Sequence, residues 1–192
     1  MGFHDHYDRL YAAKDHAGES DTILGVLGLD TGDRLLEAGC GTGRHSRAFA
    51  AAGISVTAVD TDEEMIAQAR TTSPGENPVF HAGTVASLAD GGFDGAAALF
   101  NVANYVTSRN LLRDLFASIS ERLKPGAGFA FDCWNGVAVI ADPPRNEVRS
   151  IEADGWSYRV EITADTDFMR QTSHIRNAFD ATGPSGERET FT

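Results

Sequence analysis

Cysteines and long apolar runs are scarce in this chain, and each scarcity removes a class of protein. Only Cys40 and Cys133 are cysteines among 192 residues, which excludes a disulfide framework, and neither stands at a metal-ligand spacing. No apolar stretch has the roughly 20 residues that a helix needs to cross a bilayer. The first residues lack the basic segment and apolar run of a secretory signal, and His4 and His6 among them indicate a solvated terminus. We therefore expect a cytoplasmic protein that uses neither a membrane nor a metal.

Positive charge is scarce as well. Lysine and arginine total 16 against 28 acidic residues, which gives a formal net charge of -12 at pH 7. Such a chain repels phosphate backbones and anionic lipid surfaces unless its basic residues are segregated, and here the arginines are scattered. We therefore expect no nucleic-acid partner. The length suits one domain with a sizeable core.

Strands and helices alternate from the start of the chain to about residue 140. The expected strands are residues 34–38, 54–59, 79–82, 93–101 and 129–132. Helices are expected at residues 20–29, 44–52 and 111–123, and another follows Thr61, which stands at a capping-box spacing from Glu64. This alternation predicts an α/β fold, an open and mainly parallel sheet with helices on both faces.

The pattern changes in the last quarter of the sequence. Residues 156–162 alternate between apolar and polar behind an Asp154-Gly155 turn, and residues 168–179 alternate again. Alternation of this kind predicts an antiparallel meander. We interpret residues 1–140 as the α/β core with an N-terminal cap, and residues 141–192 as an antiparallel lid segment of the same domain.

A glycine-rich turn follows the first expected strand. Gly39, Gly41 and Gly43 are spaced as G-x-G-x-G, whereas a dinucleotide fingerprint needs its third glycine where Arg44 stands, and no phosphate-binding Gly-Lys-Ser or Gly-Lys-Thr follows. Asp60 ends the second strand, where a carboxylate can accept hydrogen bonds from ribose hydroxyls. Alone, this acid is more simply a strand-end residue or helix cap. Loop and acid together favour a ribose-bearing ligand.

These segments resemble the motifs of one enzyme family. Residues 36–43 resemble the first motif of the class I S-adenosylmethionine-dependent methyltransferases, and residues 59–65, followed by Ala69-Arg70, resemble the second. Residues 93–101 and 123–126 are similar to the motifs of the fourth and fifth strands. Residues 7–15 are similar to the N-terminal cap of a small-molecule subgroup that includes sugar N,N-dimethyltransferases and glycine N-methyltransferase-like enzymes.

The resemblance implies a cofactor, S-adenosylmethionine, and a set of residues around it. These are Tyr11, Lys14, Glu37, Gly39, Cys40, Gly41, Asp60, Thr61, Met65, Thr84, Val85 and Leu99. Asp60 would hold the ribose, Met65 would lie beside the adenine, and Leu99 would lie under the sulfonium. For Met65 and Leu99, core packing is the alternative. The chain departs from the subgroup at Thr84 and Val85, where an acidic residue usually caps the adenine amino group.

The acceptor site is less defined by sequence. Methyl transfer from a sulfonium needs mainly alignment, so an amine acceptor needs only its lone pair, while a hydroxyl acceptor needs a base. The resemblance points to Tyr105 and Tyr7 as catalytic residues and to Trp134 and Asn104 as acceptor contacts; packing is the alternative. Asp132 either orients an amine or is a structural strand-end acid. We expect a small amine as the acceptor, and a small hydroxylated metabolite second.

The resemblance also implies parts that this sequence does not contain. Class I enzymes have seven strands, whereas five are counted here before the meander, so the final helix and strands are missing. An uncovered strand at 129–132 would expose an apolar sheet edge. We expect either a truncated chain or a homodimer that covers this edge. The alternative function is an adenosyl-ligand binding module without turnover; an aminopropyltransferase would need an acidic cluster that residues 101–105 do not provide.

Overall fold

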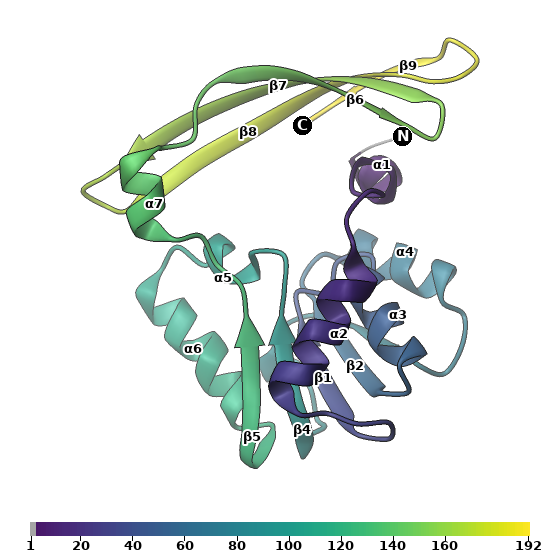
Figure 1. Cartoon of the computed structure of the whole chain (residues 1–192), viewed down its shortest axis with the longest axis vertical. Coiled ribbons are helices and arrows are strands. Elements are labelled where there is room, and N and C mark those ends of the chain that lie inside the picture. The colour runs from purple at the N-terminus through teal and green to yellow at the C-terminus, as the bar shows by residue number, and fades with distance from the viewer. Residues whose placement is uncertain (1–2) are drawn as a thin grey trace. The chain divides into compact units, whose positions relative to one another are not determined.

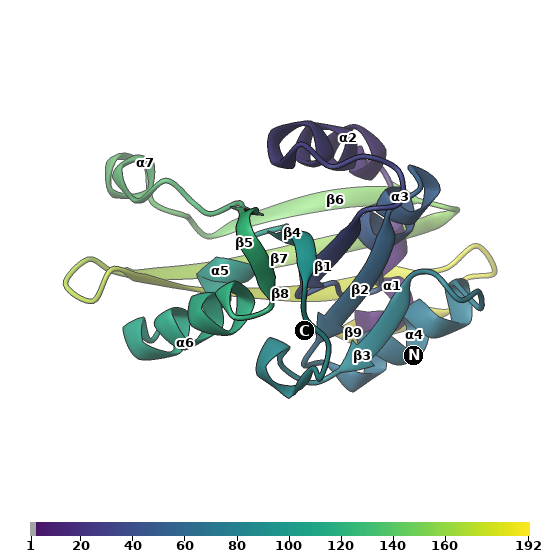
Figure 2. The same ribbon diagram turned by 90° about the horizontal axis from the view of Figure 1, so that it is seen from below.

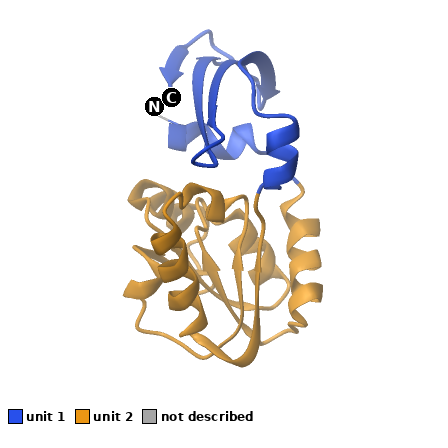
Figure 3. Ribbon diagram, turned by 90° about the vertical axis from the view of Figure 1, so that its left-hand side faces the viewer, with its two compact units in different colours: residues 1–14, 134–192 blue, residues 15–133 orange. Residues whose placement is uncertain are grey.

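The computed structural model describes residues 3–192, and the chain divides into two compact units (Figure 3). Residues 15–133 form the unit that we call the α/β unit. The N-terminal residues as far as Lys14 and residues 134–192 form the second, which we call the meander unit. Each unit has its own buried cluster of side chains and is described by itself. None of the helices in residues 3–192 combines the length and apolar character required to cross a bilayer.

The α/β unit contains a parallel sheet of five strands in the order β3-β2-β1-β4-β5 (Figure 1). The strands are β1 (Arg34–Ala38), β2 (Ser55–Asp60), β3 (Val79–Ala82), β4 (Phe93–Ala98) and β5 (Leu123–Phe131). The predicted fold class is confirmed. The chain order reverses between β1 and β4, which are hydrogen-bonded neighbours. In open α/β sheets, ligands bind beyond the carboxyl ends of the strands at such a reversal.

Helices cover both faces of this sheet (Figure 2). They are α2 (His16–Leu27), α3 (Arg44–Ala51), α4 (Glu63–Thr72), α6 (Arg109–Ser120), the short α5 (Val102–Tyr105) and the 3₁₀ turn η1 (Val85–Ser87). Successive β1 side chains point to opposite faces. Leu35 packs in one cluster with Phe49 of α3, and Leu36 packs in the other with Ile119 of α6, and all four side chains are at most 1% exposed.

Three element boundaries differ from the sequence prediction. Helix α2 begins at His16 because the carboxylate of Asp15 accepts the N–H of Gly18 at 2.9 Å. Thr61 is not the cap of α4: Asp62 is, and its Oδ1 accepts the N–H groups of the second and third helical residues at 3.0 and 3.1 Å. Strand β5 begins at Leu123, since the Lys-Pro-Gly segment continues the strand past an irregularity opposite β4.

The meander unit holds a four-stranded antiparallel sheet in the order β6-β7-β8-β9. Its elements are α1 (Phe3–Leu10), α7 (Gly136–Ala141), β6 (Glu147–Ala153), β7 (Trp156–Asp167), β8 (Thr172–Thr182) and β9 (Arg188–Phe191). The predicted meander is confirmed. Asp154 and Gly155 both have positive φ, 50° and 78°, as a two-residue hairpin turn between β6 and β7 requires.

A buried histidine joins α1 to this sheet, so the expectation of a solvated terminus is wrong at His6. His6 is 0% exposed, and its Nδ1 lies 3.0 Å from the hydroxyl of Tyr158 on β7. Its Nε2 lies 3.3 Å from the carboxylate of Glu189 on β9. The ring also stacks on Phe191, with centroids 4.8 Å apart. Both ring nitrogens have polar partners, which a buried imidazole requires.

We predict that His6→Ala lowers the free energy of unfolding by about 2–4 kcal/mol, because it leaves a cavity and removes the imidazole that contacts Tyr158 and Glu189. Urea unfolding followed by tryptophan fluorescence will report it, since Trp156 lies with its ring centroid 4.7 Å from that of His6. The control is His174→Ala, an exposed histidine of β8, for which a change within about 0.5 kcal/mol is expected. Equal effects of the two substitutions would contradict this role of His6.

Candidate functional site

The loop between β1 and α3 is built from three glycines with left-handed backbone. Their φ angles are +72° at Gly39, +55° at Gly41 and +80° at Gly43. A Cβ atom at Gly39 would lie 2.4 Å from the Val102 side chain, and one at Gly43 would lie 2.5 Å from the Phe80 ring. A Cβ at Gly41 would meet no atom within 4 Å. Two of the glycines therefore serve internal packing, while Gly41 leaves its backbone open to a ligand.

Asp60 fixes this loop to the end of β2. Its Oδ2 accepts the N–H of Gly41 at 2.7 Å, and its Oδ1 accepts the N–H of Asp62 at 3.0 Å. Each carboxylate oxygen carries two lone pairs, so Asp60 retains capacity for further donors such as hydroxyls. Thr61, between the two acids, is exposed. Asp60 can therefore hold the backbone at the end of β2 and also accept hydrogen bonds from a ligand.

Glu37 is a buried acid within β1. It is 2% exposed, and its carboxylate accepts the hydroxyl of Ser46 on α3. Burial raises the pKa of Glu37 from 4.5 to about 7; the Ser46 hydrogen bond opposes this rise and the nearby charge of Asp60 adds to it. Glu37 therefore titrates near neutral pH, in the strand that leads into the glycine loop.

The remaining predicted cofactor residues of this unit are mostly buried. Cys40, Met65, Val85 and Leu99 are 3–8% exposed. The Cys40 thiol donates to the carbonyl of Gly41 at 3.8 Å, and burial raises the pKa of that thiol, which stays protonated. Thr84 is exposed, and its carbonyl accepts the Ser87 hydroxyl at 2.6 Å.

The carboxyl end of β4 is a strained corner that sequence reasoning missed. Phe100 and Asn101 both have φ of 65°, a conformation that costs a non-glycine residue about 1–2 kcal/mol. The carboxylate of Asp132 accepts both of their N–H groups, Oδ2 from Phe100 at 3.0 Å and Oδ1 from Asn101 at 2.6 Å. Asn101 then caps α5, which carries Asn104 and Tyr105. The signal in the sequence was Asp132 itself, an acid at the end of the strand beside β4.

One known family matches the part of the chain that carries this geometry. A family model described as a methyltransferase domain matches residues 35–126, which span β1, the glycine loop, Asp60, the β4 corner and the start of β5. The chain carries a domain of the methyltransferase family. The resemblance to S-adenosylmethionine-dependent methyltransferases is thereby confirmed, and S-adenosylmethionine is the cofactor of that family.

Individual proteins are also similar to this chain, in sequence or in fold. YqeM of Bacillus subtilis (strain 168), a protein named as a methyltransferase, is 31% identical over 143 residues, which are 72% of this chain and 57% of YqeM. The fold of DesVI from Streptomyces venezuelae matches all of this chain and 81% of its own, with a TM-score of 0.85 and 22% identity. CalS10 from Micromonospora echinaspora, an amino pentose methyltransferase solved with S-adenosylmethionine bound, matches 93% of this chain and 75% of its own, with a TM-score of 0.73 and 21% identity.

Four other predicted site residues lie outside the methyltransferase domain, in the meander unit: Tyr7, Tyr11, Lys14 and Trp134. Tyr7 is on α1, Tyr11 and Lys14 follow that helix, and the rings of Tyr7 and Tyr11 lie with centroids 4.8 Å apart. Trp134 is 43% exposed and lines an open hollow of about 590 Å³ with side chains of α7, β7 and β8. Tyr105, in the α/β unit, is 85% exposed. The roles of these side chains stay predictions.

We predict that Glu37 makes the domain less stable as the pH rises. Because the folded pKa is raised from 4.5 to about 7, the stabilising contribution is complete below pH 4.5 and is lost as the pH passes through about 7. The free energy of unfolding of wild type relative to Glu37→Gln should fall by about 3 kcal/mol between pH 4.5 and pH 8.

Urea unfolding of both proteins at the two pH values measures this change. Taking the difference between the proteins cancels the titration of Asp94 and Glu189, whose pKa values are lowered by hydrogen bonds to Lys124 and His6. A difference that is the same at both pH values would show that the Glu37 pKa is not raised.

Proposed function

We propose that this protein transfers the methyl group of S-adenosylmethionine to a small-molecule acceptor, and that the acceptor is an amine. One observation carries the proposal: Gly41 presents an open, left-handed backbone beside the Asp60 carboxylate, within a methyltransferase domain. YqeM extends well beyond the part that this chain matches, which is 57% of its length.

The residues of the site fit this cofactor. The space above Gly41 admits a ligand against the backbone, and Asp60 has lone pairs left for the two ribose hydroxyls. Met65 lies on α4 and Leu99 directly follows β4, and they are assigned to the adenine and the sulfonium. Thr84 and Val85 follow β3, where the adenine end would lie. Lys14 and Tyr11 are assigned to the cofactor's carboxylate end.

Alignment is the main task of the protein in this reaction. When bound, S-adenosylmethionine supplies a methyl group that is already activated on a sulfonium. The chain then has to bring the acceptor's lone pair in line and exclude water. Glu37 and the backbone amides of the glycine loop are assigned to the methionine part of the cofactor. Asn104, Tyr105, Tyr7 and Trp134 are assigned to the acceptor.

Two observations favour an amine over a hydroxyl. Asp132, a carboxylate at this edge of the sheet, already accepts two backbone N–H groups, so both of its oxygens are engaged in holding the backbone rather than in taking a hydroxyl proton. In addition, CalS10, which shares the fold, is an amino pentose methyltransferase. A neutral amine needs its lone pair exposed and no base before the attack.

We predict that Gly41→Ala weakens S-adenosylmethionine binding at least about tenfold, because the new methyl occupies the open space over the loop. Isothermal titration calorimetry measures the dissociation constant. The matched control is Gly28→Ala, since Gly28 caps α2 with φ +66° and a Cβ atom there would also meet no atom within 4 Å. Both substitutions should cost similar stability, about 1 kcal/mol. Equal losses of affinity would contradict the placement of the cofactor over Gly41.

We also predict that amines, and not alcohols, accept the methyl group. A panel of amino sugars and other small amines, with hydroxyl compounds of matched shape, can be assayed by transfer of radiolabelled methyl from S-adenosylmethionine. Turnover of amines alone would support the proposal, and turnover of alcohols alone would overturn its acceptor class. Tight cofactor binding without any turnover would favour the alternative, an adenosyl-ligand binding module.

A further inference from the structure

The exit from β4 differs from every other left-handed non-glycine position in residues 3–192. Four non-glycine residues have positive φ there: Phe100, Asn101, Asp154 and Gln171. Asp154 and Gln171 lie in the turns between β6, β7 and β8, where hairpins require such angles. Phe100 and Asn101 are consecutive and belong to no hairpin. Their conformation therefore needs a separate cause.

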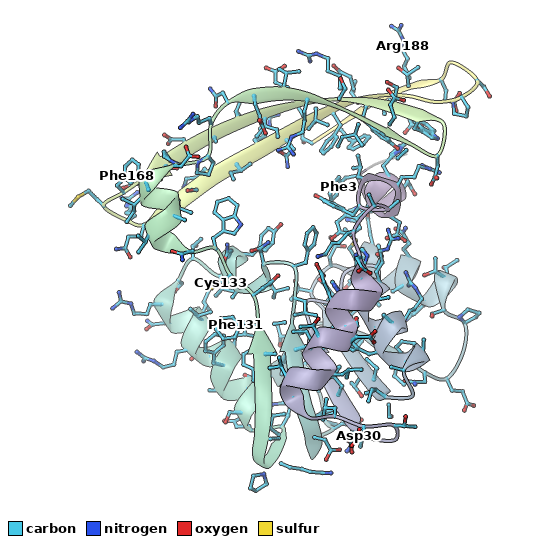
Figure 4. The ribbon with its side chains drawn as sticks, in the orientation of Figure 1. Phe3, Asp30, Phe131, Cys133, Phe168 and Arg188 are labelled. Atoms are coloured by element: carbon cyan, nitrogen blue, oxygen red, sulfur yellow. The ribbon has the colours of Figure 1, made fainter. Side chains whose placement is uncertain are left out.

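Asp132 supplies that cause from the neighbouring strand. Its backbone N–H pairs with the carbonyl of Ala98, the last residue of β4, at 3.4 Å. Its two carboxylate oxygens accept the N–H groups of Phe100 and Asn101, one each, at 3.0 and 2.6 Å. Phe131 and Cys133, which flank it, mark the end of β5 in Figure 4. One side chain thus holds two consecutive amides in the unfavourable conformation.

The corner is attached to the glycine loop on its other side. Asn101 caps α5, and its carbonyl accepts the N–H of Asn104 at 2.9 Å. Val102, the next residue, fills the space that a Cβ at Gly39 would need. Residues 99–105 are therefore fixed at two points, by the Asp132 carboxylate and by the cofactor loop.

We propose that Asp132 is a positioning residue for methyl transfer. Its carboxylate keeps Phe100 and Asn101 left-handed, and this sets the places of Leu99, Asn104 and Tyr105 at the carboxyl edge of the sheet. The inference rests on the proposed function, in which these residues face the sulfonium and the acceptor. Asp60 and Gly41 are held by other contacts, so cofactor binding depends much less on Asp132 than the transfer step does.

The test compares Asp132→Asn with a matched acid at the opposite edge of the sheet, near the start of the neighbouring strand β4. Asp94 of β4 likewise bridges strands, since Oδ2 accepts the N–H of Arg34 at 3.0 Å and Oδ1 accepts Lys124 at 2.5 Å. For Asp132→Asn we expect kcat to fall about 10- to 100-fold, the effect of losing one charge-assisted hydrogen bond. The dissociation constant for S-adenosylmethionine should stay within about threefold. Asp94→Asn should leave kcat within about twofold.

A second variant separates positioning from direct contact with the acceptor. Glycine adopts positive φ without help, so Asn101→Gly added to Asp132→Asn should recover at least about fivefold in kcat. No recovery would overturn the proposal, as would a wild-type kcat in Asp132→Asn. A loss confined to the KM for the amine would also overturn it, because that result indicates that Asp132 binds the acceptor itself.

Hydrogen exchange at the Phe100 and Asn101 amides gives a readout that needs neither cofactor nor acceptor. We expect protection at both amides in the wild type and a loss of at least about tenfold in Asp132→Ala, with Asp94→Asn unchanged at these amides. Unchanged exchange in Asp132→Ala would overturn the proposal even if activity fell. If the wild type transfers no methyl group at all, the proposed function fails, while the exchange result still decides whether Asp132 holds the corner.

Discussion

The hydrogen bond from the Gly41 N–H to Asp60 is the contact on which the candidate site depends. It joins the turn after β1 to the end of β2, the two strands whose carboxyl ends flank the cofactor in the proposed function. The bond holds the loop in a left-handed path with its backbone uncovered at Gly41. Val102 packs against this loop at Gly39, and Glu37 lies in the strand that leads into it.

Much of this arrangement followed from the sequence. The G-x-G-x-G spacing and an acid at the end of the next strand are local patterns, and alternation of strands and helices fixes a parallel sheet whose carboxyl ends meet at one edge. The five strands and the meander were predicted in their order along the chain. The features that could be predicted are those that depend on residues close together in the sequence.

The contacts between distant segments could not be predicted in this way. Nothing local to Phe100 or Asn101 demands positive φ, and the reason is a carboxylate 31 residues further on. The cap of α4 was wrong by one residue because both Thr61 and Asp62 suit that position, and the tertiary path selected Asp62. The terminal position of His6 favours a solvated side chain, whereas contacts with β7 and β9 bury it completely.

The three loop glycines are required for different reasons, and this difference has an evolutionary consequence. The steric demand at Gly39 comes from Val102 and that at Gly43 comes from Phe80, so a smaller partner can relieve either demand. In diverging sequences, positions 39 and 102 should therefore co-vary, as should positions 43 and 80. Position 41 has no such partner within the described residues of the protein. Its variation should follow changes in the ligand rather than changes in the fold.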